Sequence, residues 1–426
     1  MHKIFRKVRK FFKKLGPGFI TGMSDNDPSG VAAYTQTGAQ FGYGQLWMAF
    51  FMLPLMTAIQ EVSARIGAVT GKGLAWVIRE HYGKTVLYIS VIIVLIANTI
   101  NIGADLGAMA AAAKLIIPIP FPVLILIFTA LILFLEIFIS YKTYARVLKW
   151  FGLALISYPL TMFLVREPWG EILKATFVPH IEFSFAFIFI VVGVLGTTIS
   201  PYLFFWQASE EVEEEKERHL IKKDGHPNIT KRFIKDLRID NFFGMFFSEI
   251  GAWSIIIVGA TVLHTNGILN VGSAAEAAQA LEPLVQTFPH AGLIAKFIFA
   301  IGIMGLGLLA VPVLSGSASY AVSETLNWKE GLNLKLKKAH GFYGVITIAT
   351  IIGLIINFIG ISPIKALIYA AVLNGIAAVP LIFIMARIAR NKKIMGEYRS
   401  GMFSNILVWA TFLIMGIAVL GMFIAI

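Results

Sequence analysis

Long apolar segments recur along this chain, and they limit its possible folds more than any other feature of the sequence. Each has roughly 17–25 residues, the length of a helix that crosses a lipid bilayer. Eleven such segments are centred near Ser29, Leu55, Ala97, Phe128, Ser157, Ser200, Trp253, Met304, Ile351, Val372 and Ile414. Because 57% of the 426 residues are hydrophobic and only 14% are charged, lipid is the main solvent of this chain. The sequence therefore predicts an all-α integral membrane protein with eleven transmembrane helices.

Basic residues are concentrated in alternate connections between these segments. The N-terminal stretch and every second connection hold 31 of the 36 Lys and Arg residues. The other five are Lys114, Arg166, Lys174, Lys296 and Lys365. Cytoplasmic loops are enriched in Lys and Arg, so the pattern predicts a multi-pass protein of the cell membrane with a cytoplasmic N-terminus and an external C-terminus. Since the net charge of +12 is spread over short loops, we expect the lipid bilayer, and no nucleic acid, as a partner.

The same pattern divides the chain into five regions. They are a basic cytoplasmic N-terminus (1–16), a first repeat with five helices (17–166), an external connection (167–183), a second repeat with five helices (184–388), and a cytoplasmic loop with the last helix (389–426). The second repeat contains a cytoplasmic connection at 207–240 and an external one at 264–290. The N-terminal apolar run lacks a small-residue cleavage site, so we expect a retained first helix. The sequence does not define the oligomeric state.

Seven acidic residues lie within or beside the apolar segments. They are Asp25, Asp27, Glu61, Asp105, Glu136, Glu249 and Glu324. A carboxylate at bilayer depth is costly and commonly faces a cavity or a transport pathway. For the four glutamates, however, a structural role is favoured. Glu61 can pair with Arg65 one helical turn away, and Glu136 is close enough to a helix end to approach the headgroups. The other two glutamates can form bonds across helices.

Asp27 differs from the other acids because a proline follows it. Pro28 lacks a backbone donor and disfavours helix at the preceding residue, so we expect the first helix to unwind near the middle of the membrane. Pro201 predicts a second break in the sixth helix. Broken helices at corresponding positions of two halves are typical of transporters with five-plus-five inverted repeats, the fold of amino-acid/sodium symporters, in which the substrate binds between the breaks. Two independent proline kinks are the alternative.

Five motifs of this chain occur together in one family of membrane transporters. "GPGFITGMSDNDPSG" and "QEVSARIGAVTGKGLAWVIREHYG" are similar to that family's first two helices, which carry Asp-Pro-Gly-Asn and Gln-x-x-x-x-Arg-Leu-Gly patterns. "ADLGAMAAAAKLI", "TTISPYLFFWQ" and "LNGIAAVPLIFIMARIARNKKIMGEYRS" extend the similarity through the third, sixth and tenth helices. The chain thus resembles the Nramp family of divalent-metal transporters over nearly its whole length. The resemblance implies eleven helices, the first ten of them arranged as inverted repeats.

The resemblance also implies a metal site at the two breaks. Asp27 matches the family's metal-binding aspartate, and Ser24 and Thr197 match positions that offer backbone carbonyls. Gly30 stands where the family has a metal-binding asparagine, and Ser200 stands where it has a methionine. The expected site is therefore built from oxygen atoms. Oxygen ligands suit hard ions such as Mg²⁺, whereas a thioether favours softer metals.

Six further residues are candidates for the transport pathway or its gates. They are Asp25, Tyr202, Asp105, Gln207, Asn374 and Glu61. Tyr202 and Gln207 replace two histidines of the family, and Ala108 replaces the glutamate of its third-helix Asp-Leu-Ala-Glu motif. The ninth segment also lacks the family's arginines. These losses make tight proton coupling unexpected and leave Asp105 as the one candidate relay.

The expected function is a secondary transporter that moves divalent cations, with Mg²⁺ or Mn²⁺ favoured, by alternating access. No enzymatic activity and no cofactor are expected, because the metal ion is the transported substrate. One alternative is a proton-coupled Mn²⁺/Fe²⁺ importer of the ordinary Nramp type. Another is a cation-coupled amino-acid symporter of the same fold, in which Asp27 would repel the substrate carboxylate. An intramembrane aspartyl protease lacks its Tyr-Asp and Gly-x-Gly-Asp patterns here, and a structural or receptor-like protein gives no reason for Asp27 beside Pro28.

Overall fold

Helices make up most of the part of the chain that the computed structural model describes, namely residues 16–139, 155–165, 167–221 and 227–425. The α-helices are α2 (Pro17–Asp25), α3 (Pro28–Phe41), α4 (Trp47–Thr70), α5 (Leu74–Ala113), α6 (Phe121–Phe138), α8 (Ser157–Leu164), α9 (Trp169–Phe177), α10 (Phe185–Thr198), α11 (Pro201–Glu217), α12 (Lys231–Val258), α13 (Ala274–Gln279), α14 (Glu282–Val285), α15 (Ala291–Leu326), α16 (His340–Ile356), α17 (Pro363–Arg390), α18 (Lys392–Met395) and α19 (Met402–Ile424). A π-helical turn (Gly259–His264) continues α12, and the 3-10 helices are Leu336–Lys338 and Gly396–Tyr398. The one β-pairing in the described residues is an isolated bridge between Ile221 and Pro227.

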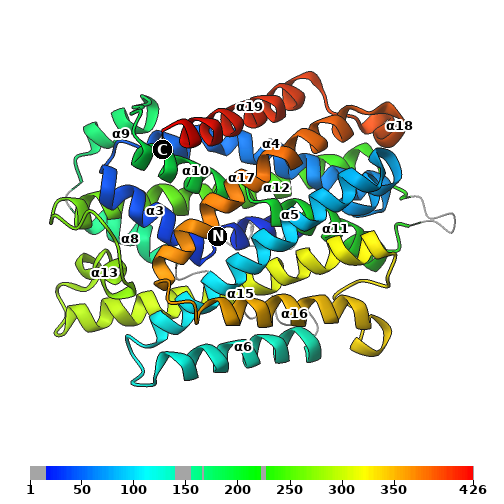
Figure 1. The fold of residues 1–426 in the computed structure, drawn as a ribbon. Coiled ribbons are helices and arrows are strands. Elements are labelled where there is room, and N and C mark those ends of the chain that lie inside the picture. Colours follow the sequence, from blue (N-terminus) through cyan, green and yellow to red (C-terminus); the bar gives the residue numbers. More distant parts are fainter. Residues whose placement is uncertain (1–15, 140–154, 166, 222–226, 426) are drawn as a thin grey trace, which may run out of the picture.

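The long helices lie side by side and run between two ends of the molecule (Figure 1). Their outer faces are apolar, as shown by Phe134 on α6, which is 54% exposed, and Ile417 on α19, which is 68% exposed. A surface of this kind is unfavourable in water and favourable in lipid, where helices also satisfy their own backbone hydrogen bonds. The all-α membrane fold predicted from the sequence is therefore confirmed.

Eight helical segments of the described chain have the length and composition needed to cross a membrane. Three of the eleven expected spans fall outside this set for separate reasons. The first is divided into α2 and α3, and the ninth, α16, has only 17 residues. Part of the fifth lies at 140–154, outside the described residues, and its described helix α8 has only 8 residues. Nearly all of the N-terminal region 1–16 also lies outside the described residues. The number eleven and the five sequence regions therefore stay predictions.

Both predicted helix breaks are present. α2 ends at Asp25 and α3 begins at Pro28, and the two residues between them leave the helical conformation. In the sixth span, α10 ends at Thr198 and α11 begins at Pro201. Each proline takes the first position of the second helix, where its missing N–H would have no intrahelical partner in any case. Because the helix is interrupted in both spans, they are broken helices and not continuous helices with a proline kink.

The two halves of the chain pack in matching ways. α3, the second half of helix 1, lies against α12, the second helix of the second repeat, and α11, the second half of helix 6, lies against α4, the second helix of the first repeat. α5 and α15, the third helices of the two repeats, lie side by side along their length. Gly22 and Gly244 allow a close approach of α2 and α12, since a Cβ on Gly22 would lie 2.2 Å from the carbonyl carbon of Gly244. This is the arrangement of a five-plus-five inverted repeat.

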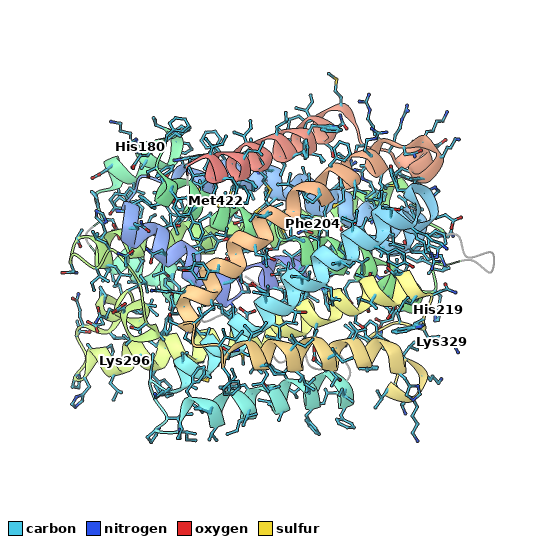
Figure 2. The ribbon with its side chains drawn as sticks, in the orientation of Figure 1. His180, Phe204, His219, Lys296, Lys329 and Met422 are labelled. Carbon is cyan, nitrogen blue, oxygen red and sulfur yellow. The ribbon has the colours of Figure 1, made fainter. Side chains whose placement is uncertain are left out.

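The polar connections collect at the two ends of the helices. His219 and Lys329 lie at one end, whereas His180 and Lys296 lie at the other (Figure 2). The charge pattern assigns the first pair to the cytoplasm and the second pair to the outside, and this sidedness stays a prediction. The expected connection at 207–240 is mostly helical, because α11 and α12 extend into it. The connection at 264–290 contains the short helices α13 and α14.

Candidate functional site

Asp27 lies in the break of the first helix and caps the N-terminus of α3. Its Oδ1 accepts the backbone N–H of Gly30 at 2.7 Å and the hydroxyl of Ser29 at 2.6 Å. Thr197 on α10 donates to the same oxygen at 3.5 Å, and Nδ2 of Asn101 on α5 donates to Oδ2 at 2.9 Å. Only 1% of Asp27 is exposed. The positive end of the α3 dipole and these four donors favour the charged carboxylate at the meeting point of helices 1, 3 and 6.

The break of the sixth helix contacts the same carboxylate through Thr197. The neighbouring Ser200 hydroxyl lies within hydrogen-bond distance of the carbonyls of Gly196, at 2.6 Å, and Thr197, at 2.8 Å. The Thr197 carbonyl, a predicted metal ligand, is thus already hydrogen-bonded in this conformation. Gly30 presents an N–H and no oxygen to Asp27, and a Cβ on Gly30 would lie 3.1 Å from Thr197 Oγ1. There is consequently little room for a side chain where the family has an asparagine.

Ser24 and Tyr202 connect the two breaks directly. The Tyr202 hydroxyl donates to the backbone carbonyl of Ser24 at 3.1 Å. This carbonyl belongs to the last turn of α2, where carbonyls have no partner within the helix. A second connection joins α3 to α10, where the hydroxyls of Tyr34 and Thr198 lie 2.7 Å apart. The predicted carbonyl ligand at Ser24 is therefore close to the sixth helix but holds a hydrogen bond from it.

A polar strip on α5 continues from Asp27. Asn101 Oδ1 accepts a hydrogen bond from Nδ2 of Asn374 on α17, at 3.5 Å. Asp105 lies one turn further along α5 and is completely buried, and neither of its oxygens has a hydrogen-bond partner within the described residues. Both Asp105 and Asn374 thus lie beside the candidate metal site, and a role of Asp105 as a relay stays a prediction.

Gln207 lies on α11, away from the carboxylate of Asp27. Its Oε1 accepts the hydroxyl of Thr21 on α2, and its Nε2 donates to Glu211 at 2.9 Å. These bonds join the first half of helix 1 to the second half of helix 6. Gln207 therefore lies at the contact between α2 and α11, and its amide is held by hydrogen bonds to Thr21 and Glu211.

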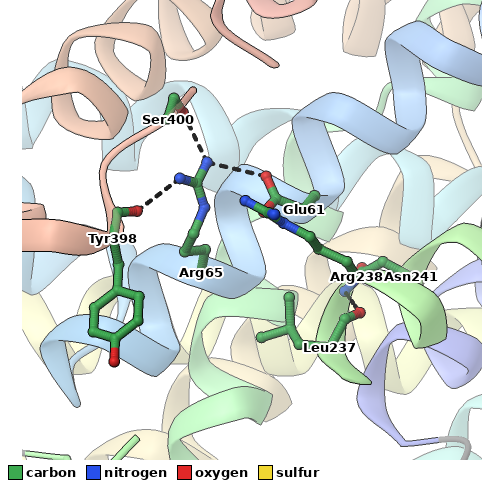
Figure 3. Close-up of polar contacts among 7 residues, drawn as sticks. All are labelled: Glu61, Arg65, Leu237, Arg238, Asn241, Tyr398 and Ser400. Carbon is green, nitrogen blue, oxygen red and sulfur yellow. Dashed lines mark hydrogen bonds and ion pairs between the residues drawn. The ribbon is translucent and has the colours of Figure 1, made fainter. Parts of the chain in front are cut away.

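Glu61 belongs to an ion-pair network that joins three segments of the chain (Figure 3). Arg65 donates to Glu61 at 3.0 Å, and this confirms the i,i+4 pair predicted on α4. The same guanidinium donates to Ser400 Oγ and to the carbonyl of Tyr398, each at 2.7 Å. Arg238 on α12 donates to the other Glu61 oxygen at 2.8 Å. The network therefore ties α4 and α12 to the loop before α19.

Two of the remaining acids have hydrogen bonds across helices. Glu324 accepts the backbone N–H of Trp76 and the hydroxyl of Ser209, each at 3.0 Å, which confirms its structural interpretation. Glu136 does not approach the headgroups, and that expectation is wrong. It is 5% exposed because α15 covers it and supplies the hydroxyl of Ser315 as a donor.

Asp25 and Glu249 lie at the contact of α2 with α12. Asp25 is completely buried, and one of its oxygens accepts the hydroxyl of Ser248. Glu249 was expected to form bonds across helices, but neither of its oxygens has a hydrogen-bond partner within the described residues, so that expectation is wrong. The physical reason is that α2 presents another acid to it where a donor would be needed.

Four polar residues of the site were not singled out from the sequence: Ser29, Asn101, Tyr34 and Thr198. Asn101 precedes Asp105 by four residues, so both project from one face of a helix, and this spacing is a signal that could have identified it. Ser29 follows Asp27 by two residues, where a hydroxyl can reach a capping carboxylate. The pairing of Tyr34 with Thr198 is a contact between distant segments and leaves no local signal.

Two cavities lie at opposite ends of the molecule, and residues of the breaks line neither of them. The larger has a volume of about 750 Å³, and its lining includes Tyr43, Glu171, His180 and His264. The smaller has a volume of about 190 Å³, and its lining includes Lys72, Glu213, Lys216, Glu324 and Glu330. Burial, together with repulsion from Glu324, raises the pKa of Glu330 to about 9. Burial likewise raises the pKa of Tyr43 to about 12. Because no residue of either helix break lines these two cavities, Asp27 is closed off from both of them in this conformation.

Sequence comparisons relate the chain to known transporters. A family profile described as "Natural resistance-associated macrophage protein-like", or Nramp, matches residues 18–425. The "Divalent metal cation transporter MntH" of Caldanaerobacter subterraneus is 27% identical over 404 residues, which cover 92% of this chain and 88% of that protein. The protein of the same name from Listeria welshimeri is 26% identical over 426 residues, which cover 95% and 88%.

Solved structures show the same fold. The manganese transporter of Eremococcus coleocola, solved with an aromatic bis-isothiourea compound, superposes with a TM-score of 0.79 at 15% identity, over 98% of this chain and 87% of that one. MhsT in complex with L-phenylalanine superposes with a TM-score of 0.55 at 12% identity, over 96% and 98%. At these identities the likeness concerns the fold alone.

Proposed function

Since the chain belongs to the Nramp family of divalent metal cation transporters, we propose that it moves hard divalent cations, Mg²⁺ before Mn²⁺, through a site centred on Asp27. The observation that carries the proposal is the position of this carboxylate, which is 1% exposed and lies where both broken helices meet. Each of its partners in the described chain is a hydroxyl, an amide or a backbone N–H. None of these partners offers a sulfur ligand, so the ligands available to an ion beside Asp27 are oxygen atoms, such as the hydroxyls of Ser29 and Thr197.

The binding residues have defined roles in this proposal. Asp27 supplies the charge, and the carbonyls of Ser24 and Thr197 become ligands when the Tyr202 and Ser200 hydroxyls turn away from them. Mg²⁺ loses its hydration shell reluctantly, so retained water completes the coordination sphere. The missing thioether at Ser200 removes the ligand that would favour a softer metal.

We propose transport by alternating access, and the closed centre between two cavities supports this. α2 and α11 are the half-helices on the predicted cytoplasmic side, and they are joined there by the hydrogen bond of Thr21 to Gln207. Movement of such halves around a fixed central site is the usual way in which inverted-repeat transporters open to one side. Tyr202 and Gln207 replace histidines, so we expect no tight proton coupling. We propose a cell-membrane location with a cytoplasmic N-terminus.

Ion uptake into proteoliposomes tests the proposal, with Mg²⁺, Mn²⁺ and Ca²⁺ compared side by side. We expect Asp27→Ala to abolish uptake, whereas Glu136→Gln, a matched change of a buried acid outside the site, leaves it near the wild-type rate. Ser200→Met should shift the preference toward Mn²⁺ by about tenfold, which corresponds to ~1.4 kcal/mol. Full uptake by Asp27→Ala would refute the site. Strong acidification of the vesicle interior during uptake would refute the expected absence of tight coupling.

A further inference from the structure

Asp25 and Glu249 form a second pair of buried acids, at the contact of α2 with α12. Asp25 is 0% exposed and Glu249 is 5% exposed. Asp25 Oδ1 and both oxygens of Glu249 have no hydrogen-bond partner within the described residues. The other oxygen of Asp25 accepts the hydroxyl of Ser248, the residue directly before Glu249, so the two acids lie at the same helix contact. No Lys, Arg or His in that part of the chain forms an ion pair with either acid. Two buried negative charges without a counter-charge are strongly unfavourable.

Asn26 adds a neutral oxygen to this pair. The Ser248 carbonyl accepts Asn26 Nδ2 at 3.0 Å, while the Ser248 hydroxyl donates to Asp25. Because its amide nitrogen is engaged with α12, Asn26 keeps Oδ1 buried and without a donor in the described chain. Gly251 makes this close contact possible, since a Cβ there would lie 3.2 Å from Asn26 Nδ2. One unpartnered amide oxygen therefore accompanies the three unpartnered carboxylate oxygens.

A purely structural pair of acids would have donors across the helix contact. Glu324 shows what such an acid looks like in this protein, with a backbone N–H and a hydroxyl from two other helices at 3.0 Å. Asp27 likewise has donors on both oxygens. Glu249 has none within the described residues, so the neutralisation of this pair is left to a ligand that carries positive charge.

The geometry points to a second divalent-cation site, formed by the carboxylates of Asp25 and Glu249 and the amide oxygen of Asn26. Carboxylate and amide oxygens suit Mg²⁺, Ca²⁺ and Mn²⁺, and one such ion neutralises both acids. Ser248 positions Asp25 and Asn26 through its two hydrogen bonds. The site lies at the end of α2, across the helix break from Asp27, so a bound ion holds α2 against α12. The choice of a divalent cation as the ligand rests on the proposed function, whereas the site itself rests on the contacts of Asp25, Asn26 and Glu249.

Equilibrium binding of Mn²⁺ to the purified full-length protein tests this inference. We expect two equivalents for the wild type, one for Asp27→Ala, one for Glu249→Gln, one for Asp25→Asn, and none for Asp27→Ala combined with Glu249→Gln. Glu136→Gln is the matched control and should keep two. Without metal, Glu249→Gln should also melt at a higher temperature than the wild type, because it removes an uncompensated buried charge. Added Mn²⁺ should then raise the melting temperature of the wild type more than that of Glu249→Gln.

The outcomes separate this inference from the proposed function. If Glu249→Gln and Asp25→Asn bind as many equivalents as the wild type, the second site is refuted while the Asp27 site stands. If Asp27→Ala keeps all equivalents, the proposed function is refuted even where Glu249→Gln loses one. If the wild type binds no Mn²⁺, both are refuted.

Discussion

Gly22 allows α2 to lie directly on α12, and its replacement by alanine should loosen this contact. A Cβ at this position would lie 2.2 Å from the Gly244 carbonyl carbon, where an ordinary contact begins at 3.4 Å, so the helices must separate by about 1.2 Å. The obstacle is backbone, which cannot rotate away as a side chain can. Overpacking of this kind costs about 1–3 kcal/mol, which corresponds to a roughly 5- to 150-fold rise in the population with α2 detached.

A single cysteine thiol on the face of α12 that α2 covers can report the detachment of α2, because a thiol reagent reaches it only when α2 has moved away. The chain has no cysteine, so Asn241→Cys introduces a unique one. Asn241 is 0% exposed, and a Cβ on Gly18 would lie 2.8 Å from its backbone nitrogen, which shows that α2 covers it. When labelling requires opening, its rate follows the open population, so Gly22→Ala in the Asn241→Cys protein should label roughly 5- to 150-fold faster.

Gly344→Ala is the matched control for this experiment. Gly344 is also in a helix, but a Cβ there would meet nothing within 4 Å. This variant therefore measures the helix-propensity gain of the same exchange, which is about 1 kcal/mol in the stabilising direction. If Gly22→Ala labels and melts like Gly344→Ala, the close packing of α2 on α12 and the reasoning built on it are wrong.

Three further predictions concern residues around the site and at the smaller cavity. Arg65→Lys replaces a guanidinium that has three acceptors, and the loss of charge-assisted bonds should lower the free energy of unfolding by about 1.5–3 kcal/mol, measured by denaturant titration. Asn101→Leu leaves Asp27 Oδ2 without its donor and should cost about 1–3 kcal/mol in the same assay, whereas an unchanged midpoint would contradict that bond. Burial raises the pKa of Glu330 to about 9, so between its ordinary value and pH 9 the unfolded chain holds fewer protons at this residue and stability falls as pH rises. Glu330→Gln should therefore flatten the fall in melting temperature between pH 6 and 9, and an unchanged slope would refute this.

Local features of the sequence were sufficient to predict the spans and the breaks. Apolar length decides whether a helix crosses the bilayer, and it is a property of the segment itself. A proline removes a helical hydrogen bond at its own position and disfavours helix at the residue before it. Pro54, Pro312 and Pro380 nevertheless lie inside continuous helices, and polar residues accompany the prolines at the two breaks. Asp27 was recognised for the same reason, because its neighbour Pro28 ends the helix beside it. The i,i+4 pair of Glu61 and Arg65 is also local and is present.

Contacts between distant segments were beyond the reach of such reasoning. Glu136 and Glu249 are both acids in apolar segments, yet one has a hydroxyl from α15 and the other has no donor in the described chain. Which partner an acid meets depends on how the helices are packed, and no local pattern records it. The same is true of Asn101, which reaches Asp27 from another helix.

The sequence by itself determined that this chain spans a membrane, that two of its helices are broken, and that an aspartate stands at one break. Hydrophobic length and proline geometry act within a few residues, which is why a linear reading was enough. Only the tertiary structure decided which donors hold Asp27, that α2 and α12 meet through glycines, and that Asp25 and Glu249 share one buried contact. Those outcomes depend on helix packing between distant segments of the chain, as in the hydrogen bond between Asp25 and Ser248, which are 223 residues apart.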